Sequence, residues 1–119
     1  MLNPFENWTV GDPWDSGEAD VPEIGRNAFE ACLKALDKTT SQQRTTSVLL
    51  YGEPGSGKTH LIRRLRRQTA SRALFVYIRL STSPNMIWRH LRRRLSGDLL
   101  RPSAGGASQL YDLLLRRLA

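Results

Sequence analysis

One run of eight residues combines glycine, lysine and threonine at a spacing that can hold phosphate groups. Residues 52–59 read Gly-Glu-Pro-Gly-Ser-Gly-Lys-Thr and fit the pattern G-x-x-x-x-G-K-[ST] without a mismatch. Gly55 and Gly57 permit backbone angles and a close approach that a Cβ would obstruct, so successive N–H groups can point at phosphate oxygens. The run therefore predicts a P-loop, which binds the phosphates of a nucleoside triphosphate.

Each residue of this loop has an expected role. Lys58 is the candidate catalytic residue, because its ammonium can reach the β- and γ-phosphates, and the Thr59 hydroxyl is suited to be a Mg²⁺ ligand. The Glu53 side chain is expected to point away from the loop, so it takes no proton-transfer role. The predicted cofactor-binding residues here are Gly52, Glu53, Pro54, Gly55, Ser56, Gly57, Lys58, Thr59 and His60. None of them touches the base, so the pattern alone does not choose between ATP and GTP.

The elements on either side supply the strand–loop–helix context that a P-loop needs. Residues 47–51 form a short apolar run before the loop and predict a buried parallel strand. Residues 60–67 predict a helix that turns its leucines and isoleucine inward and its arginines outward. Residues 73–80, rich in β-branched and aromatic side chains, predict a second strand. Together these segments make one βαβ unit.

Three more helices are expected from apolar residues at helical spacing. The first begins near Arg26, fades at residues 38–40, and includes Cys32 as a small core residue. The next begins at Ser83-Pro84, with Ser83 as N-cap and Pro84 in the first helical position, and ends near Gly97. The last follows a Pro/Gly/Ser loop and is capped by Ser108.

Charge is distributed unevenly along the 119 residues. The net charge is +7, yet the first 23 residues hold six acidic groups and no Lys or Arg. The rest of the chain carries all 18 basic groups and only five acidic ones, a surplus that attracts nucleic acid, anionic proteins or nucleotides alike. No apolar run is long enough to cross a bilayer and no secretion signal is visible, so we expect a cytoplasmic protein without membrane association.

Residues 1–22 are expected to form an acidic arm rather than part of the folded domain. They contain three prolines and three large aromatic residues without a helical or strand period: Phe5, Trp8 and Trp14. Such aromatics are expected to pack on a neighbouring surface, either of this chain or of another protomer. Residues 23–119 then form the nucleotide-binding domain.

The loop and its flanks resemble the opening of AAA+ ATPases, particularly origin-recognition-like and signal-transduction (STAND) members. The resemblance rests on residues 21–26 (VPEIGR), a helix, and residues 49–59 (LLYGEPGSGKT), and it extends through residues 75–78 and 111–114. It implies a three-layer α/β sandwich with a parallel sheet, and it places Ile24 and Gly25 near the adenine of Mg·ATP. Nucleotide is therefore the expected partner, and assembly with copies of itself or with another ATPase chain is in keeping with the family.

The chain departs from that family in lacking a Walker B element, a strand ending in Asp-Asp or Asp-Glu that positions Mg²⁺ and activates water. Residues 78–80 end the second strand without an acid, and Asp98 and Asp112 fall in helical segments. The sandwich is thus expected to be incomplete, with strands missing between the two present. Hydrolysis by this chain alone is doubtful.

A different class of function is a basic adaptor for nucleic acid or protein, with the P-loop kept as a sensor or relic. Two helices carry four arginines each, at residues 63, 64, 66 and 67 and at residues 89, 92, 93 and 94. Two solvated helix faces in an arginine-rich protein explain them as well, and we favour that interpretation because no DNA-binding module is recognisable. Trp88 and His90 are then packing and surface residues. A small-molecule kinase is less favoured, since it needs a lid and an acceptor site.

Overall fold

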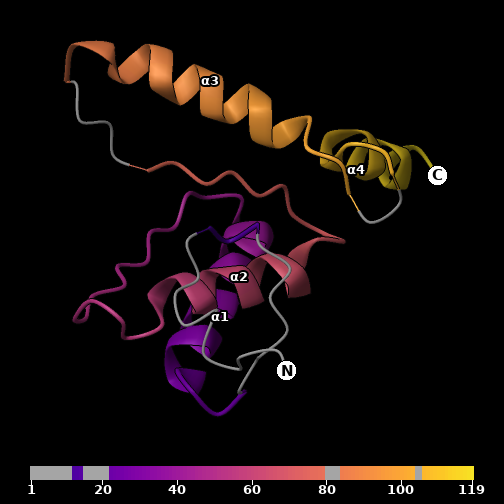
Figure 1. The fold of residues 1–119 in the computed structure, drawn as a ribbon. Helices are drawn as coiled ribbons and strands as arrows, with labels where there is room; N and C mark the ends of the chain where they lie inside the picture. The colour runs from indigo at the N-terminus through magenta and orange to yellow at the C-terminus, as the bar shows by residue number, and fades with distance from the viewer. Residues whose placement is uncertain (1–11, 15–21, 80–83, 104–105) are drawn as a thin grey trace, which may run out of the picture. The chain divides into compact units, whose positions relative to one another are not determined.

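The computed structural model describes residues 12–14, 22–79, 84–103 and 106–119. Its chain divides into two compact units, residues 1–67 and residues 68–119, which are described separately. The helices follow in the order α1 (Arg26–Gln42), α2 (Lys58–Thr69), the 3₁₀ helix η1 (Pro84–Met86), α3 (Ile87–Leu99) and α4 (Gln109–Leu118) (Figure 1). The four α-helices predicted from apolar spacing are therefore confirmed.

The first unit has a small core between α1 and α2. Phe29 and Cys32 of α1 and Leu61 of α2 are buried together, and partly buried apolar residues pack around them. These positions recur at helical spacing in the sequence, so each helix presents one apolar face to the other. Cys32 is a core residue as predicted, and burial raises the pKa of its thiol.

The described part of the N-terminal arm packs on the same chain. Pro13 is fully buried, and its carbonyl oxygen accepts a hydrogen bond from Arg66 Nε at 3.0 Å. The Arg66 guanidinium also lies 4.8 Å from the centre of the Trp14 ring, a distance suited to a cation–π interaction. For Trp14, the neighbouring surface expected from the sequence is thus α2. Phe5 and Trp8 lie outside the described residues.

The prediction that the arginines of α2 all face outward is wrong for two of them. Arg63 and Arg64 are only 4% and 6% exposed. Arg63 Nη2 lies 3.0 Å from His60 Nδ1, while the Arg64 guanidinium lies 5.5 Å from the centre of the Phe29 ring. A guanidinium is planar and weakly hydrated, so it can be buried where aromatic rings and hydrogen-bond acceptors contact it. Residues 63, 64, 66 and 67 therefore form no continuous basic surface.

The second unit contains η1, α3 and α4. Ser83 lies outside the described residues, and Pro84 begins the 3₁₀ turn rather than the α-helix, which starts at Ile87 after an N-cap, Met86, without a side-chain cap. A 3₁₀ turn is common at the N-terminus of an α-helix, which explains the later start. Ser108 caps α4 as predicted, because its hydroxyl accepts a hydrogen bond from the Tyr111 N–H.

The extended segment 73–79 is bound by side chains of the two helices that follow it. The Gln109 carboxamide accepts from the Phe75 N–H at 3.0 Å and donates to the Phe75 carbonyl oxygen at 2.7 Å. The buried Asp98 carboxylate accepts from the Tyr77 N–H at 2.8 Å. Because Phe75 and Tyr77 are two residues apart, these bonds fall on one edge of the extended backbone. Side chains thus occupy the positions that a neighbouring strand would occupy.

Neither predicted strand is paired with another strand in the described ranges. Residues 47–51 and 73–79 are non-helical there, and a single antiparallel bridge joins Pro102 and Ser108. Leu49 and Tyr51 are 84% and 88% exposed, whereas Leu50 between them is partly buried against the core of the first unit, so one side of this apolar run is covered and the other is exposed. The three-layer α/β sandwich remains a prediction. No helix within the described ranges has the length and apolar character needed to span a membrane.

Candidate functional site

The predicted P-loop leads into α2. Residues 52–57 are exposed, and the α-helix begins at Lys58, so the unsatisfied N–H groups of its first turn lie at the end of the loop. These donors and the positive end of the helix dipole favour an anion at this place. The Leu61 N–H donates to the Gly57 carbonyl oxygen at 2.9 Å, which closes the first turn.

Glycine is required at two points of the loop backbone. Gly55 and Gly57 both have a φ of 83°, in the left-handed region where a residue with a Cβ is strained. A Cβ added at Gly57 would meet no atom within 4 Å, so space on that side is open. Open space beside backbone N–H groups is what a phosphate group needs for close approach. The backbone angles expected of Gly55 and Gly57 are therefore observed, and their role in phosphate binding stays a prediction.

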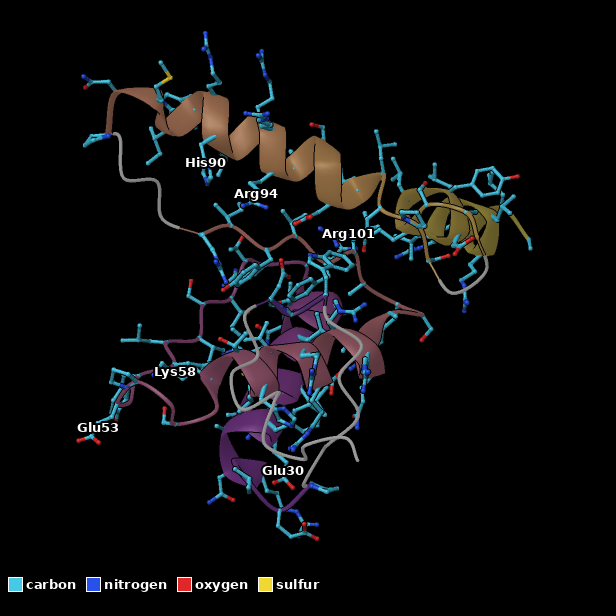
Figure 2. The ribbon with its side chains drawn as sticks, in the orientation of Figure 1. Glu30, Glu53, Lys58, His90, Arg94 and Arg101 are labelled. Carbon is cyan, nitrogen blue, oxygen red and sulfur yellow. The ribbon has the colours of Figure 1, made fainter. Side chains whose placement is uncertain are left out.

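The Lys58 ammonium points toward the backbone of the loop that precedes it, residues 52–57. Its Nζ donates to the carbonyl oxygens of Gly52 at 2.8 Å and Glu53 at 2.7 Å, and to Ser56 Oγ at 3.2 Å. The lysine therefore holds a positive charge over the loop, bonded to neutral oxygens. An anion entering the loop would offer this ammonium charged oxygens, which make stronger hydrogen bonds. The Glu53 carboxylate points away from Lys58, as Figure 2 shows.

The remaining candidate residues lie along α2 and before α1. Thr59 and His60 occupy the first turn of α2 and are half-buried. Ile24 and Gly25 precede α1, and a Cβ on Gly25 would lie 3.3 Å from Leu61 Cδ1. Leu61 is one turn beyond Lys58 on the same helix. The structure thus places Ile24 and Gly25 beside the helix that carries Lys58.

Thr59 is the residue of the loop that is expected to bind Mg²⁺. No group of three or more His, Cys, Asp and Glu residues suited to a metal was found within the described ranges. Mg²⁺ bound with a nucleotide usually takes few protein ligands and completes its octahedron with phosphates and water, so a single hydroxyl at this position fits it.

Asp98 and Asp112 are engaged elsewhere. Asp98 is 3% exposed, with one oxygen bonded to the Tyr77 N–H and the other 3.7 Å from Arg101 Nε. The Asp112 carboxylate accepts a hydrogen bond from the Ser103 hydroxyl. Both carboxylates therefore hold residues 73–119 together. The structure gives neither one the exposed position at a strand end that a Walker B acid requires.

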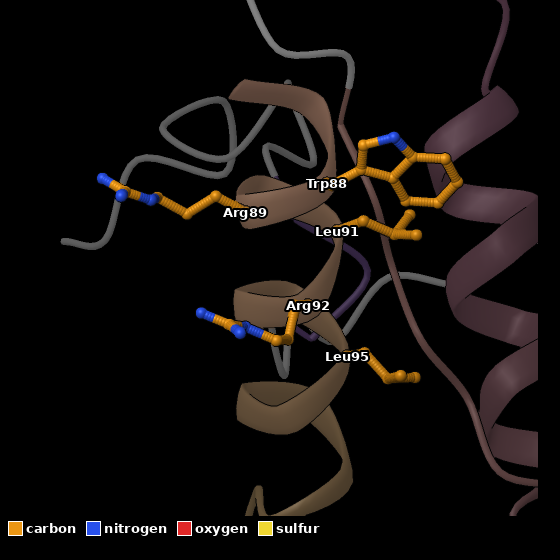
Figure 3. Close-up of a pocket in the computed structure, with 5 residues that line it drawn as sticks. All are labelled: Trp88, Arg89, Leu91, Arg92 and Leu95. Atoms are coloured by element: carbon orange, nitrogen blue, oxygen red, sulfur yellow. The ribbon is translucent and has the colours of Figure 1, made fainter. Parts of the chain in front are cut away.

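A surface hollow lies along α3. Trp88, Leu91 and Leu95 line one side of the helix, while Arg89 and Arg92 point to the other (Figure 3). Trp88 is 79% exposed, so the expectation that it is a packing residue is wrong in this structure. His90 Nε2 lies 2.9 Å from the Arg79 carbonyl oxygen. The apolar side of α3 offers no set of donors like that of residues 52–59.

Arg64 is the residue that sequence reasoning missed. It donates to the carbonyl oxygens of Ile24 at 3.2 Å and Pro22 at 3.4 Å, across 40 and 42 positions of the chain. In the sequence it is one of four similar arginines. The only available signal was its place three residues after the inward-facing Leu61, on the same face of α2.

A glycine-rich loop that leads from an extended segment into a helix, with its lysine held over the loop, defines a P-loop phosphate-binding protein. A family model described as "AAA ATPase domain" matches residues 25–119. The chain therefore belongs to the AAA ATPase domain family and is an AAA+ ATPase-like nucleotide-binding module. The searches of curated proteins and of solved structures found no match.

Proposed function

We propose that this chain binds Mg·ATP and that residues 52–59 hold the phosphates of the nucleotide. Nucleotide binding is then the function of this chain in an ATPase of the AAA+ class. The observation that carries the proposal is the loop geometry: Gly55 and Gly57 in the left-handed region, directly followed by the N-terminus of α2. Lys58 exchanges its three loop oxygens for phosphate oxygens, and the Thr59 hydroxyl binds Mg²⁺. Ile24 and Gly25 face the base, which favours ATP over GTP.

Hydrolysis is a separate step, and we assign it to the assembled ATPase. Attack by water on the γ-phosphate needs a group that positions the water. The acids at residues 98 and 112 support the second unit instead. A carboxylate from another segment or another chain would complete the site. The bound nucleotide then acts by changing the conformation of the assembly.

Equilibrium binding of Mg·ATP and Mg·GTP to the purified chain tests the proposal, with Lys58→Ala as the site variant and Lys38→Ala as the control. Lys38 is exposed on α1, so its replacement removes the same charge away from the loop. A hydrogen bond to a charged group contributes about 1.5–3 kcal/mol, so Lys58→Ala is expected to weaken ATP binding about 10- to 100-fold. Circular dichroism checks that each variant retains its helices.

Two results would contradict the proposal. A folded wild-type chain that binds neither nucleotide would show that residues 52–59 are not a working site. Equal losses for Lys58→Ala and Lys38→Ala would show that only the net charge attracts the nucleotide. Stronger binding of GTP than of ATP would leave the phosphate site standing and overturn the base preference.

The basic surface of α3 supports a second candidate, binding of nucleic acid. Arg89, Arg92 and Arg93 are exposed on this helix. Charge reversal at all three should lower the affinity for single-stranded RNA and reduce its dependence on salt, because each phosphate contact releases counterions. An unchanged salt dependence would exclude the surface as a nucleic-acid site.

A further inference from the structure

The buried guanidinium of Arg64 joins two parts of the first unit that are distant in sequence. Its Nη1 donates to the carbonyl oxygens of Pro22 and Ile24, and its guanidinium lies 5.5 Å from the centre of the Phe29 ring. Arginine stays charged in a protein, so burying it is costly unless its donors are bonded. Arg64 is only 6% exposed, and its hydrogen bonds therefore fix the backbone that precedes α1.

The helix that carries Arg64 also carries the P-loop lysine, Lys58. Leu61 is three residues from Lys58 and three from Arg64, so its side chain neighbours both on the helix surface, whereas Lys58 and Arg64 lie about 120° apart around the helix. Leu61 packs against Gly25, where an added Cβ would lie only 3.3 Å from Leu61 Cδ1, so the missing side chain permits this close approach. Residues 22–25 are thus attached to α2 at two points, one and two turns beyond Lys58. The distance of this segment from the P-loop is fixed by a single rigid helix.

The attached segment leaves an apolar side chain accessible. Ile24 is 61% exposed, although its carbonyl oxygen is bound by Arg64. A base is flat and largely apolar on its faces, so an accessible isoleucine on the segment attached to α2 can pack against it. Arg64 Nη1 is directed to backbone oxygens, and the side chain is only 6% exposed, so it is not placed to bind phosphate itself.

We propose that Arg64 is a positioning residue for nucleoside recognition: it holds residues 22–25 against α2 so that they contact the base while Lys58 holds the phosphates. The proposal rests on the proposed function, since it needs a nucleotide in residues 52–59. Its particular claim is that Arg64 acts on the nucleoside part of the ligand and leaves phosphate binding unchanged.

Arg64→Met, compared with Arg67→Met, separates these contributions. Methionine keeps an apolar stem and removes the guanidinium, and Arg67 is an exposed arginine of the same helix. Dissociation constants are measured for Mg·ATP and for magnesium tripolyphosphate, which has no nucleoside. Loss of hydrogen bonds from a buried charged group predicts about tenfold weaker ATP binding by Arg64→Met. Tripolyphosphate binding stays unchanged, and Arg67→Met leaves both constants unchanged.

The ratio of the two dissociation constants is the decisive quantity, because a smaller folded fraction weakens both ligands equally and cancels. An unchanged ratio in Arg64→Met would overturn the proposal, whether both constants rise or neither does. Arg64→Lys provides a second variant if the methionine variant does not fold. Lysine keeps the charge but lacks the planar fork, so it should restore only part of the ratio.

Failure of the proposed function gives a different result. A wild-type chain that binds neither ligand removes the phosphate site, and the role of Arg64 is rejected with it. A wild-type chain that binds tripolyphosphate as tightly as ATP keeps the phosphate site and rejects the role of residues 22–25 alone.

Discussion

The Gln109 carboxamide pairs with both backbone groups of Phe75, accepting from its N–H at 3.0 Å and donating to its carbonyl oxygen at 2.7 Å. This is the two-bond pattern that directly opposed residues exchange in an antiparallel sheet, made here by one side chain. The same Gln109 amide nitrogen also donates to the Asp98 carbonyl oxygen. One residue at the start of α4 therefore links the extended segment to the end of α3.

Replacing Gln109 with alanine should destabilise the second unit. The change removes the acceptor for the Phe75 N–H and the donor for two carbonyl oxygens, so the free energy of unfolding should fall by about 1–3 kcal/mol. Urea titration of the full chain followed by circular dichroism measures the loss. Gln68→Ala, at an exposed position of α2, is the control and should have a much smaller effect. Equal effects at the two positions would contradict the structural role of Gln109.

Asp98→Ala should cost more stability than Asp98→Asn. Alanine leaves the Tyr77 N–H without the carboxylate that accepts from it, at a cost of about 1–3 kcal/mol, whereas asparagine keeps an acceptor oxygen there. Thermal unfolding of both variants beside the wild type would rank them. If the asparagine variant were the less stable of the two, the Tyr77 bond would not be the reason that Asp98 is buried.

Gly57→Ala should affect nucleotide binding more than folding. Its φ of 83° costs an alanine about 1–2 kcal/mol, and the added Cβ meets no protein atom within 4 Å. With phosphate in the loop, the same Cβ would lie beside the ligand, so ATP binding should weaken further. Comparing the unfolding free energy with the ATP dissociation constant tests this expectation.

Gly97→Ala is the matched control for that variant. Gly97 lies within α3, where alanine is favoured over glycine by about 0.5–1 kcal/mol and an added Cβ also meets no atom within 4 Å. It should stabilise the chain and leave ATP binding unchanged. Equal loss of binding in the two variants would show that Gly57 has no special role.

Cys32 should react slowly with iodoacetamide in the native chain. Burial raises the pKa of its thiol, so the reactive thiolate is scarcer at a given pH than in the unfolded chain, where the pKa is about 8.5. The native state holds the proton more tightly, so its stability falls as pH rises through the ordinary thiol range toward the raised value. Alkylation rates between pH 7 and 10, with and without urea, measure the difference. Equal rates in both conditions would contradict the buried position.

The elements that were correctly predicted depend on residues close together in the sequence. The helices near residues 26, 58, 87 and 109 were predictable because apolar spacing and caps such as Ser108 act within a few residues. The P-loop was predictable for the same reason, since its eight residues carry their own backbone requirements. The first residue of a helix was predicted less accurately. Helix α3 begins at Ile87, later than expected, because Pro84 begins a 3₁₀ turn instead.

A strand is stabilised by hydrogen bonds to a partner strand that can be distant in sequence, so local patterns do not decide whether it forms. Residues 47–51 and 73–79 have the composition expected of strands, but the described ranges contain no strand paired with either segment. In the second case Asp98 and Gln109 supply the hydrogen bonds. Nothing in the local pattern around residue 109 indicates that its side chain would bind a segment 34 residues earlier.

The sequence by itself determined the P-loop motif, the helices around it and the class of protein to which they belong, because these depend on neighbouring residues. Only the tertiary structure decided which of the similar arginines of α2 are buried and what they hold. Arg64 reaches Ile24 across 40 positions and Arg66 reaches Pro13 across 53. Such contacts form when separate elements pack together, and the packing distinguishes side chains that are chemically identical.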